Sequence, residues 1–450
     1  MPTNEPEARP RKPFVVPDGL AARQLASSAI FAVLDQRRSF DEAFQRAADA
    51  AKLAPRDRAF ARAIATTVLR RRGEIKAVLS RFLEKPIAAK EGKLEAILLS
   101  AGAQLLFLKT PPHAAISLAV DQCRADPATG RFAKLTNAVL RRVSEQGEEI
   151  LAALDPAELN IPAWLLTRWR AAYGADTARR IAEASLQEPP LDLTVKGDFP
   201  EWAGKLGGII LPTGSVRLTE AGRIEDIPGY DDGAWWVQDA AAALPAKILG
   251  DVRGLDIADL CAAPGGKTAQ LASAGANVVA VELSPARAAR LTSNLSRLKL
   301  TVETAISNVI TWAPGKLFDA VLLDAPCTAT GTIRRHPDIL YLKRAEDVAS
   351  LAQSQAKMLD ATARLVKPGG RLVYCTCSLE HDEGAAQISR FLADHRDFTR
   401  LPIDIAAIAG ESGWLTADGD LRTLPCYFAE LRPGQQGMDG FFVSLLRRAP

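Results

Sequence analysis

The sequence contains no uninterrupted apolar run long enough to cross a bilayer, since a transmembrane helix needs about 20 consecutive apolar residues. Its first residues, MPTNEPEARPRKPF, are rich in proline and charge, whereas a secretory signal peptide has an apolar core. These absences argue against a membrane-spanning or secreted protein. We therefore expect a cytoplasmic chain with no membrane partner.

Cysteine is also scarce. The six cysteines are Cys123, Cys261, Cys327, Cys375, Cys377 and Cys426. None of them forms a C-x-x-C pair, and their number is too small for a disulfide scaffold in a chain of this length. In a reducing compartment some of these thiols are candidates for chemistry.

The composition is that of a folded protein with more than one core. Hydrophobic residues make up 48% and charged residues 24% of the 450 residues, which excludes a disordered chain and predicts at least two domains. Charge is uneven, with 25 Lys and Arg against 17 Asp and Glu in residues 1–150, and 31 against 36 in the rest. The basic first third fits either a nucleic-acid docking module or a solvated helical surface.

Periodicity divides the chain into regions of different type. Long segments rich in alanine and leucine predict an all-α domain, with breaks at Leu53–Pro55, Thr110–Pro112 and Asp126–Gly130. Later, apolar segments alternate with helical ones: LDIADLCA, NVVAVEL, TVETAIS, FDAVLLDAP, GGRLVYCTCS and GFFVSLLRR. This alternation predicts a doubly wound, mostly parallel sheet. We expect a disordered tail (1–19), a helical domain (20–150), a helical linker (151–190), a small α+β subdomain (191–243) and an α/β domain (244–450).

A glycine-rich turn follows the first strand of the α/β domain. It reads Cys261, Ala262, Ala263, Pro264, Gly265, Gly266, Lys267 and Thr268. Paired glycines let a ligand approach the backbone, and the helix that follows offers free N–H groups. The turn matches neither the dinucleotide fingerprint G-x-G-x-x-G nor the full phosphate loop G-x-x-x-x-G-K-[ST].

The second strand ends at Glu282, about twenty residues further on. An acid in that place can accept hydrogen bonds from the ribose hydroxyls of an adenosine-containing ligand. NAD and S-adenosylmethionine both satisfy this pattern, and an ordinary surface acid at a strand end is the alternative.

Two further strand ends carry cysteines, in Asp324-Ala325-Pro326-Cys327 and in Cys375-Thr376-Cys377. Since strand ends of such a sheet converge on one crevice, Cys327 and Cys377 are expected to meet. Buried cysteine often behaves as a small hydrophobe, which is the interpretation favoured for Cys375 and Cys123. A metal site formed by Cys327, Cys375 and Cys377 is a weaker alternative, because C-x-C is not the usual metal spacing.

Methylation of cytosine at C5 would explain two thiols beside a cofactor. C5 is too poor a nucleophile to attack a sulfonium methyl group, but addition of a thiolate at C6 turns the ring into an enamine that can. The reaction also needs a group at the N3 edge of the ring, where Asp324 is well placed, and a base that removes the C5 proton. The target base must be unpaired or flipped out of its stack.

These motifs resemble a known family. DLCAAPGGKT, LLDAPCTATGTIRRHPDI, LVYCTCS and GMDGFF are similar, in this order, to motifs of the NOL1/NOP2/Sun RNA cytosine-5 methyltransferases. In the first third, Asp57-Arg58, VLRRRG and Asn137-Ala138-Val139-Leu140-Arg141 resemble a NusB-like helical RNA-binding domain. The resemblance implies a NusB-like domain, a small α+β subdomain and a Rossmann-like methyltransferase domain that uses S-adenosylmethionine.

The resemblance also implies roles for single residues. Cys377 would be the nucleophile and Cys327 would assist release of the methylated base. Lys267 and Asp324 would contact the target base, and Asp324 would also border the cofactor. Residues 261–267 would hold the methionine part of the cofactor.

Other implied cofactor contacts are Glu282 at the ribose and Arg287 in the pocket. Gln238 and Asp239 match the segment that precedes the first cofactor motif. The family usually has an acid at the adenine, where this chain has Asn308, whose side-chain oxygen can accept the same bond.

A second departure is Cys375, where the family usually has alanine. Residues two apart in a strand share a face, so Cys375 and Cys377 compete for the role of nucleophile. We assign it to Cys377, which is nearer the open end of the strand.

The expected substrate is a cytosine of small-subunit (16S) ribosomal RNA or its precursor, and the expected state is a monomer without metal. Transfer RNA and large-subunit ribosomal RNA are alternative substrates. A non-catalytic RNA-binding assembly factor is an alternative function, as is a DNA cytosine methyltransferase, in which the Pro-Cys thiol is the nucleophile.

Overall fold

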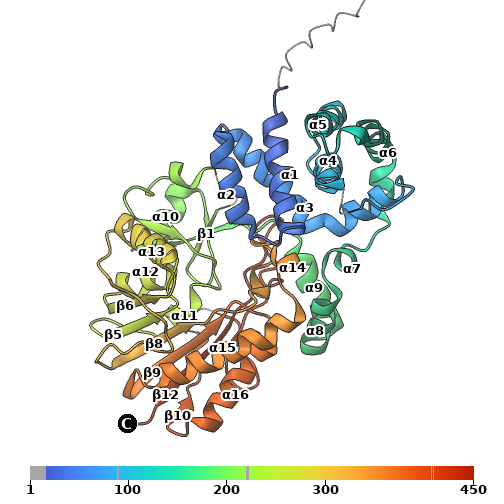
Figure 1. Cartoon of the computed structure of the whole chain (residues 1–450). Helices are drawn as coiled ribbons and strands as arrows, with labels where there is room; N and C mark the ends of the chain where they lie inside the picture. Colours follow the sequence, from blue (N-terminus) through green and yellow to red (C-terminus); the bar gives the residue numbers. More distant parts are fainter. Residues whose placement is uncertain (1–16, 89–90, 219–221, 407, 409) are drawn as a thin grey trace, which may run out of the picture. The chain divides into compact units, whose positions relative to one another are not determined.

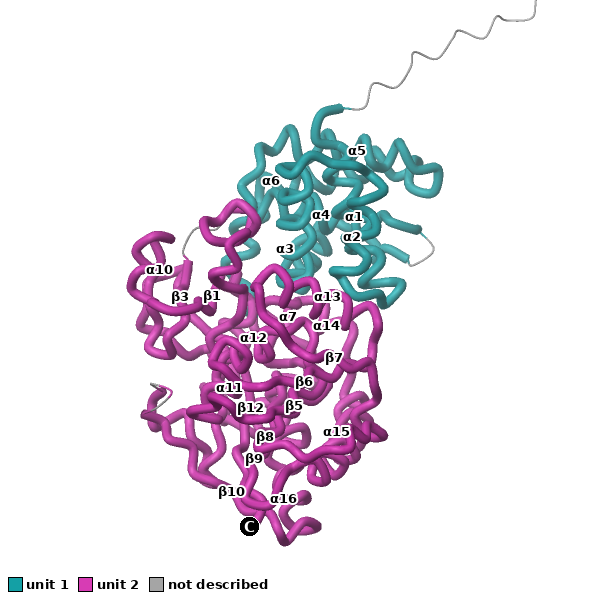
Figure 2. The backbone as a smooth tube through the Cα atoms, turned by 90° about the vertical axis from the view of Figure 1, so that its left-hand side faces the viewer, with its two compact units in different colours: residues 1–156 teal, residues 157–450 magenta. Residues whose placement is uncertain are grey.

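The computed structural model describes residues 17–88, 91–218, 222–406, 408 and 410–450 (Figure 1). The predicted disordered tail, residues 1–19, lies outside the described residues as far as residue 16. The chain forms two compact units, residues 1–156 and 157–450 (Figure 2). In the described part of the chain, no helix has the length and apolar character needed to cross a membrane.

The first unit is helical. Its helices are α1 (Leu20–Leu34), α2 (Phe40–Ala51), α3 (Pro55–Ser80), α4 (Leu94–Leu106), α5 (Pro112–Ala125) and α6 (Ala133–Ala152), with the short η2 (Gly130–Phe132). Helix α4 is buried on nearly all sides, since Leu94 and every residue from Ala96 to Gln104 are buried. A helix that is apolar all round belongs in the interior, so α4 is the centre of this unit.

The breaks predicted between these helices are confirmed. Helix α2 ends at Ala51 and α3 begins at Pro55, while α5 begins at Pro112 and ends at Ala125. Proline is favoured at the first position of a helix because it has no N–H to leave unpaired there. Close packing of α3 on α4 depends on Gly102, where a Cβ atom would lie 2.7 Å from Cγ2 of Ile75.

The second unit begins with three helices, α7 (Pro156–Asn160), α8 (Ala163–Tyr173) and α9 (Ala175–Ser185), which pack around the fully buried Trp169. A small sheet of order β2-β3-β1-β4 follows. Its elements are β1 (Leu191–Val195), α10 (Phe199–Leu206), β2 (Ile209–Ile210), β3 (Val216–Leu218), η3 (Ile224–Asp226) and β4 (Trp235–Val237).

The large sheet has the order β10-β12-β9-β8-β5-β6-β7, with β11 paired to β12. Its strands are β5 (Asp256–Leu260), β6 (Asn277–Glu282), β7 (Glu303–Ile306), β8 (Phe318–Asp324), β9 (Val366–Thr376), β10 (Phe398–Arg400), β11 (Leu421–Arg422) and β12 (Phe442–Arg448). Strands β5 to β9 pair in parallel, while β12 is antiparallel to β9.

The remaining elements of this unit are helices and short turns. They are α11 (Leu244–Lys247), α12 (Gly266–Ser273), α13 (Pro285–Arg297), η4 (Thr330–Thr332), α14 (Ile339–Leu342), α15 (Ala345–Ala363), η5 (His381–Glu383), α16 (Ala385–Asp394) and η6 (Ser412–Trp414). The predicted fold class, an all-α domain followed by a small α+β subdomain and a doubly wound α/β domain, is confirmed. All six predicted strands of the α/β domain are present, as β5 to β9 and β12.

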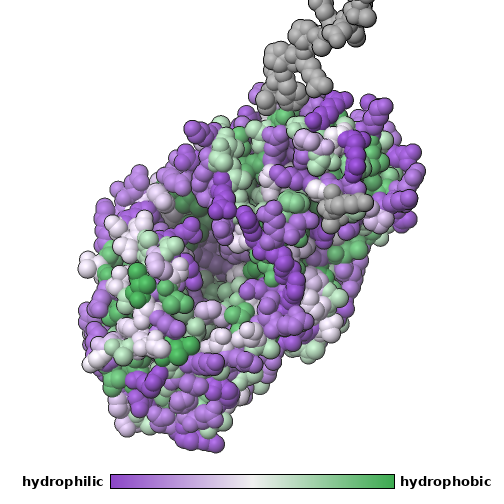
Figure 3. Space-filling model, viewed as in Figure 1, coloured by the Kyte–Doolittle hydropathy of each residue, from purple (hydrophilic) through white to green (hydrophobic). Residues whose placement is uncertain are grey.

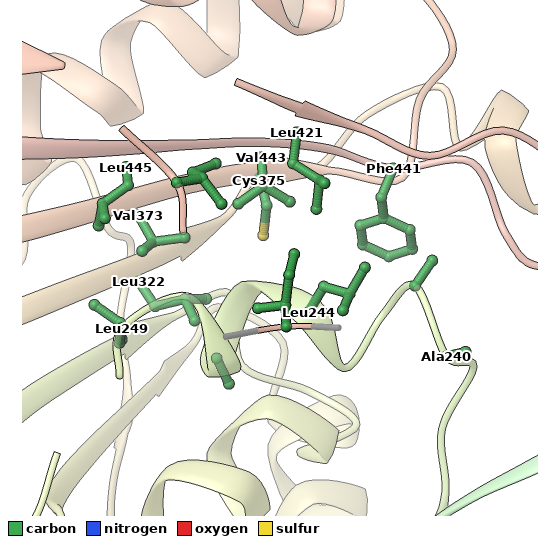
Figure 4. Packing of buried hydrophobic residues seen from close by; sticks show 14 of the residues in the cluster. Ala240, Leu244, Leu249, Leu322, Val373, Cys375, Leu421, Phe441, Val443 and Leu445 are labelled. Carbon is green, nitrogen blue, oxygen red and sulfur yellow. The ribbon is translucent and has the colours of Figure 1, made fainter. Parts of the chain in front are cut away.

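The central strands of the large sheet, β5, β6, β8 and β9, are buried on both faces, which explains why they read as nearly continuous apolar runs. Along β8, Ala320 and Leu322 belong to one apolar cluster, while Val321 and Leu323 belong to another. Figure 4 shows part of the first cluster, where β8 and β9 side chains face Leu244 near α11. On the face of the molecule seen in Figure 3, hydrophobic residues lie in small groups among hydrophilic ones.

Candidate active site

The functional residues predicted from the sequence lie at the carboxyl ends of parallel strands. Strand β5 leads into the glycine-rich turn, β6 ends at Glu282, β8 ends at Asp324, and Cys377 directly follows β9. Strand β5 lies between β6 and β8, so the chain reverses its order there. Open α/β sheets bind their ligands in the crevice at such a point.

A cavity of about 500 Å³ lies at this edge of the sheet. Among its wall residues are Trp236, Val237, Gln238, Asp239, Asp259, Cys261, Ala262, Ala263, Pro264, Gly265, Gly266, Lys267, Asp324, Arg335, His336, Cys377, Asp439 and Phe441. Its size is that of a site for a small ligand or cofactor. The structure therefore brings residues 261–267 of the glycine-rich turn, Asp324 and Cys377 to one cavity, as predicted.

The backbone path of the glycine-rich turn requires a glycine at position 265. This residue has a φ of +105°, and a Cβ atom on it would lie 2.5 Å from Cδ1 of Leu291. A side chain at this position would therefore be strained and would clash. Helix α12 begins at the next residue, Gly266, so its first N–H groups lie at the cavity.

Lys267 and Asp324 form an ion pair in the cavity wall. The Lys267 Nζ atom lies 2.7 Å from Oδ2 of Asp324, and the lysine side chain is only 10% exposed. Burial alone would lower the pKa of Lys267, but the charge of Asp324 outweighs it and raises the pKa above its usual range. Lys267 is thus held as an ammonium group, with the Phe441 ring centroid 5.1 Å from Nζ.

The two crevice cysteines meet, with 3.5 Å between the Sγ atoms of Cys327 and Cys377. Cys377 lines the cavity, whereas Cys327 is half-buried and is not part of the wall. Contact with Cys377 and burial together raise the pKa of Cys327 well above its ordinary value. Cys327 is therefore held as a thiol.

Cys375 is placed differently from Cys377. It is completely buried, and its sulfur points into the apolar side chains around Leu244 and Val443 (Figure 4). Its Sγ donates a weak hydrogen bond of 3.6 Å to Oδ1 of Asp324. Burial raises the pKa of the Cys375 thiol well above its usual value. Cys375 is thus a core residue whose sulfur contacts the Asp324 carboxylate through Oδ1.

Three predicted cofactor residues lie outside the cavity wall. Glu282 is buried and accepts hydrogen bonds from the N–H groups of Ala263 (3.3 Å) and Ser284 (3.0 Å). Arg287 donates to the carbonyl oxygen of Ala263 at 2.7 Å. Asn308 is exposed, and its Oδ1 accepts a local hydrogen bond of 3.0 Å from the N–H of Ile310.

Sequence reasoning missed Asp259, which is buried in the cavity wall. Burial raises its pKa to about 7, although Thr268 donates a hydrogen bond of 2.5 Å to its Oδ2. Its other oxygen, Oδ1, is buried and has no hydrogen-bond partner among the described residues. Its position in β5, two residues before the glycine-rich turn begins at Cys261, was the available signal.

A buried quartet of charges was also missed. Arg334 and Arg335 each pair with both Asp239 and Asp439; the Arg334 Nε atom, for example, lies 2.7 Å from Oδ1 of Asp439. The two arginines outweigh the burial of Asp239 and hold its pKa below its usual range. The motifs GTIRRHPDI and GMDGFF contain Arg334, Arg335 and Asp439, but gave no reason to join them to one another or to Asp239. Through these ion pairs Asp239, which follows β4 of the small sheet, is joined to the motifs GTIRRHPDI and GMDGFF.

Replacing Arg334 with alanine is expected to lower the free energy of unfolding by about 3–5 kcal/mol, because two buried carboxylates would lose a partner. Denaturant titration measures this change. The control is Arg179→Ala, which removes an exposed partner of Glu183 and should cost less than about 1 kcal/mol. Equal losses in the two variants would contradict a structural role for the quartet.

Among the described residues, no cluster of three or more His, Cys, Asp or Glu side chains is arranged to hold a metal ion.

Solved structures share this architecture. The crystal structure of PH0851 superimposes with a TM-score of 0.74 at 23% identity, covering 97% of this chain and 100% of the other. The crystal structure of NSun6 from Pyrococcus horikoshii with SFG gives a TM-score of 0.54 at 17% identity, covering 64% and 98%. The chain therefore has the α/β fold of these solved structures, with its cavity at the switch point of the sheet.

Sequence comparison gives the family. A model described as 16S rRNA methyltransferase RsmB/F matches residues 246–447, and the NusB family model matches residues 20–145. Ribosomal RNA small subunit methyltransferase B of Xanthomonas campestris is 36% identical over 449 residues, covering 96% of this chain and 98% of that protein. The chain belongs to the RsmB/F family of 16S rRNA methyltransferases. The family resemblance and the NusB-like domain expected from the sequence are confirmed.

Proposed function

We propose that this chain transfers the methyl group of S-adenosylmethionine to C5 of a cytosine in small-subunit ribosomal RNA. The observation that carries the proposal is the meeting of Cys377, Asp324 and Lys267 in one cavity beside the glycine-rich turn. Each of the three has a task in C5 methylation, and the turn is suited to a cofactor with a polar end.

The residues of the turn fit the proposed cofactor. Residues 261–267 would hold its methionine part, where the unpartnered Oδ1 of Asp259 offers a buried acceptor to an ammonium group. In the proposed complex Glu282 would contact the ribose of the cofactor, Arg287 would lie beside it, and Asn308 would contact the adenine. When bound, S-adenosylmethionine supplies an electrophilic methyl group.

Cys377 would act as the nucleophile. Its thiolate adds to C6 of cytosine, which moves electrons onto C5 and toward N3. Lys267 and Asp324 would stabilise the ring at its N3 edge, because the ion pair presents both a donor and an acceptor in the cavity wall. C5 can then attack the methyl group. A base then removes the C5 proton, and the electron pair of that C–H bond re-forms the C5–C6 double bond as Cys377 leaves C6 as a thiolate.

Cys327 would assist that release. It lies 3.5 Å from the nucleophilic sulfur but is not part of the cavity wall, which favours a role on the adduct over forming it. The raised pKa of Cys327 supports this division, since a thiol can donate a proton whereas a nucleophile must be a thiolate. A DNA-type mechanism with Cys327 as nucleophile is disfavoured by the same observations.

The RNA partner is supported by charge and by the first unit. A basic excess of Lys and Arg lies in residues 1–150, and phosphate contacts supply much of the affinity of such modules. The NusB-family match favours RNA over DNA as the partner. The cavity would accept a single unstacked pyrimidine, so the target cytosine is expected in an unpaired segment or flipped from a helix.

The experiment is methyl transfer from radiolabelled S-adenosylmethionine to RNA from cells that lack this gene. We expect label in 16S rRNA and not in 23S rRNA or transfer RNA, with bisulfite sequencing assigning it to one cytosine. Label in transfer RNA or 23S rRNA instead would show that the substrate is one of these RNAs and not 16S rRNA. RNA binding with no label in any RNA would favour a non-catalytic assembly factor.

A further inference from the structure

Glu383 lies between the two segments that carry the crevice cysteines, and it is completely buried. Thr328, which follows Cys327, donates to its carboxylate from both its backbone N–H (2.9 Å to Oε1) and its hydroxyl. Ser378, which follows Cys377, donates from its hydroxyl at 2.5 Å. The Glu383 carboxylate therefore accepts hydrogen bonds from the residue that follows each of the two cysteines.

The carboxylate is held as an acceptor on every side. Gln355 of α15 donates a further hydrogen bond of 3.0 Å to it. The backbone oxygen of Glu383 accepts from the hydroxyls of Tyr374 (3.0 Å) and Thr376 (3.1 Å), both in β9. Four donor groups converge on the two carboxylate oxygens, which favours the ionised form, because a protonated carboxyl would have to donate to one of the two hydroxyls instead. Burial raises the pKa of Glu383, while these donors act in the opposite direction.

We propose that Glu383 is a positioning residue for the cysteine pair. It fixes the 3.5 Å approach of Cys327 to Cys377, and its carboxylate places a negative charge beside the segment that carries Cys327. This inference rests on the proposed function for the roles of the two cysteines, but the geometry it describes does not depend on the substrate.

Charge supports the second part of the proposal. Interactions between charges are strong in a low-dielectric site; Glu383 is completely buried and Cys327 is half-buried. The pKa of Cys327 is raised first by contact with Cys377, then by burial, and also by the charges of Cys377 and Glu383.

Other titratable groups surround the same segments. Glu380 accepts a hydrogen bond of 3.4 Å from Thr330, and Arg422 donates to the backbone oxygen of Ser378. Tyr374 contacts the backbone of Glu383 rather than its carboxylate. None of these three contacts is made by the side chain of Glu383, so Glu383→Gln changes none of their partner atoms.

The test is the pH dependence of Cys327 alkylation by iodoacetamide, followed by mass spectrometry in a Cys377→Ala background. Adding Glu383→Gln should move the midpoint down by about one pH unit, because one negative charge is lost. The matched control is Asp420→Asn, the same carboxylate-to-amide change at a buried site paired with Arg400. It should leave the midpoint unchanged. No shift with Glu383→Gln, or an equal shift with both, would overturn the charge role.

The positioning role is tested by Ser378→Ala, which keeps the charge but removes one anchor. With the two cysteines intact, kcat for methyl transfer should fall about tenfold or more, while the KM for S-adenosylmethionine changes less than about twofold. Wild-type kcat in this variant would overturn the positioning role. Ser378→Ala also serves as the second variant should Glu383→Gln fail to fold. Absence of methyl transfer by the wild-type chain would instead refute the proposed function, and would leave the alkylation result standing.

Discussion

Cys377→Ala is expected to lower kcat for methyl transfer by roughly four to six orders of magnitude, the loss typical of removing a nucleophile. Without the thiolate, C5 of cytosine is not nucleophilic enough to take the methyl group. Binding of S-adenosylmethionine should persist, because the glycine-rich turn is untouched. Single-turnover transfer of radiolabel, with calorimetry for cofactor binding, measures both effects.

Two other cysteine variants serve as controls for this result. Cys426→Ala removes a half-buried thiol that is not in the cavity wall and should keep wild-type turnover. Cys375→Ala replaces a core residue by the smaller one that the family usually has there, and should retain most activity. If Cys375→Ala abolished transfer while Cys377→Ala retained it, the assignment of the nucleophile would be wrong.

Cys327→Ala is expected to trap the enzyme on its RNA. The adduct with Cys377 would still form, but its release would be slowed, and turnover should fall by about two to four orders of magnitude, as for loss of an acid–base group. A protein–RNA complex that survives a denaturing gel should accumulate when S-adenosylmethionine is present.

The double variant Cys327→Ala/Cys377→Ala supplies the control, since it has no thiol to form the adduct and should give no complex. A complex formed by Cys377→Ala but not by Cys327→Ala would reverse the two roles. That result would favour the DNA-type arrangement in which the Pro-Cys thiol is the nucleophile.

Much of the fold could be predicted because it depends on local patterns. Buried parallel strands read as short apolar runs, and a turn with Gly265 and Gly266 at a strand end marks the switch point of the sheet. Convergence of strand ends then brought Asp324 and Cys377 together without knowledge of any tertiary contact. The meeting of Cys327 with Cys377 followed from the same rule.

What could not be predicted depends on tertiary packing. Arg334 and Asp439 are about a hundred residues apart in sequence, and nothing local indicates that they share a buried quartet. Alternation along a strand placed Cys375 and Cys377 on one face, but it could not show that β9 ends between them and that only Cys377 reaches the cavity. The role of Glu383 depends on hydrogen bonds to three separate segments.

The account rests on a bond between the sulfur of Cys377 and C6 of cytosine. The most direct measurement uses the wild-type chain, S-adenosylmethionine and 16S rRNA that carries 5-fluorocytidine, whose fluorine blocks the final elimination and leaves the adduct on the protein. After digestion with trypsin and ribonuclease, fragment-ion mass spectrometry should place the nucleotide on Cys377 of the peptide LVYCTCSLEHDEGAAQISR. A nucleotide on Cys327, on Cys375 or on no cysteine would contradict the account.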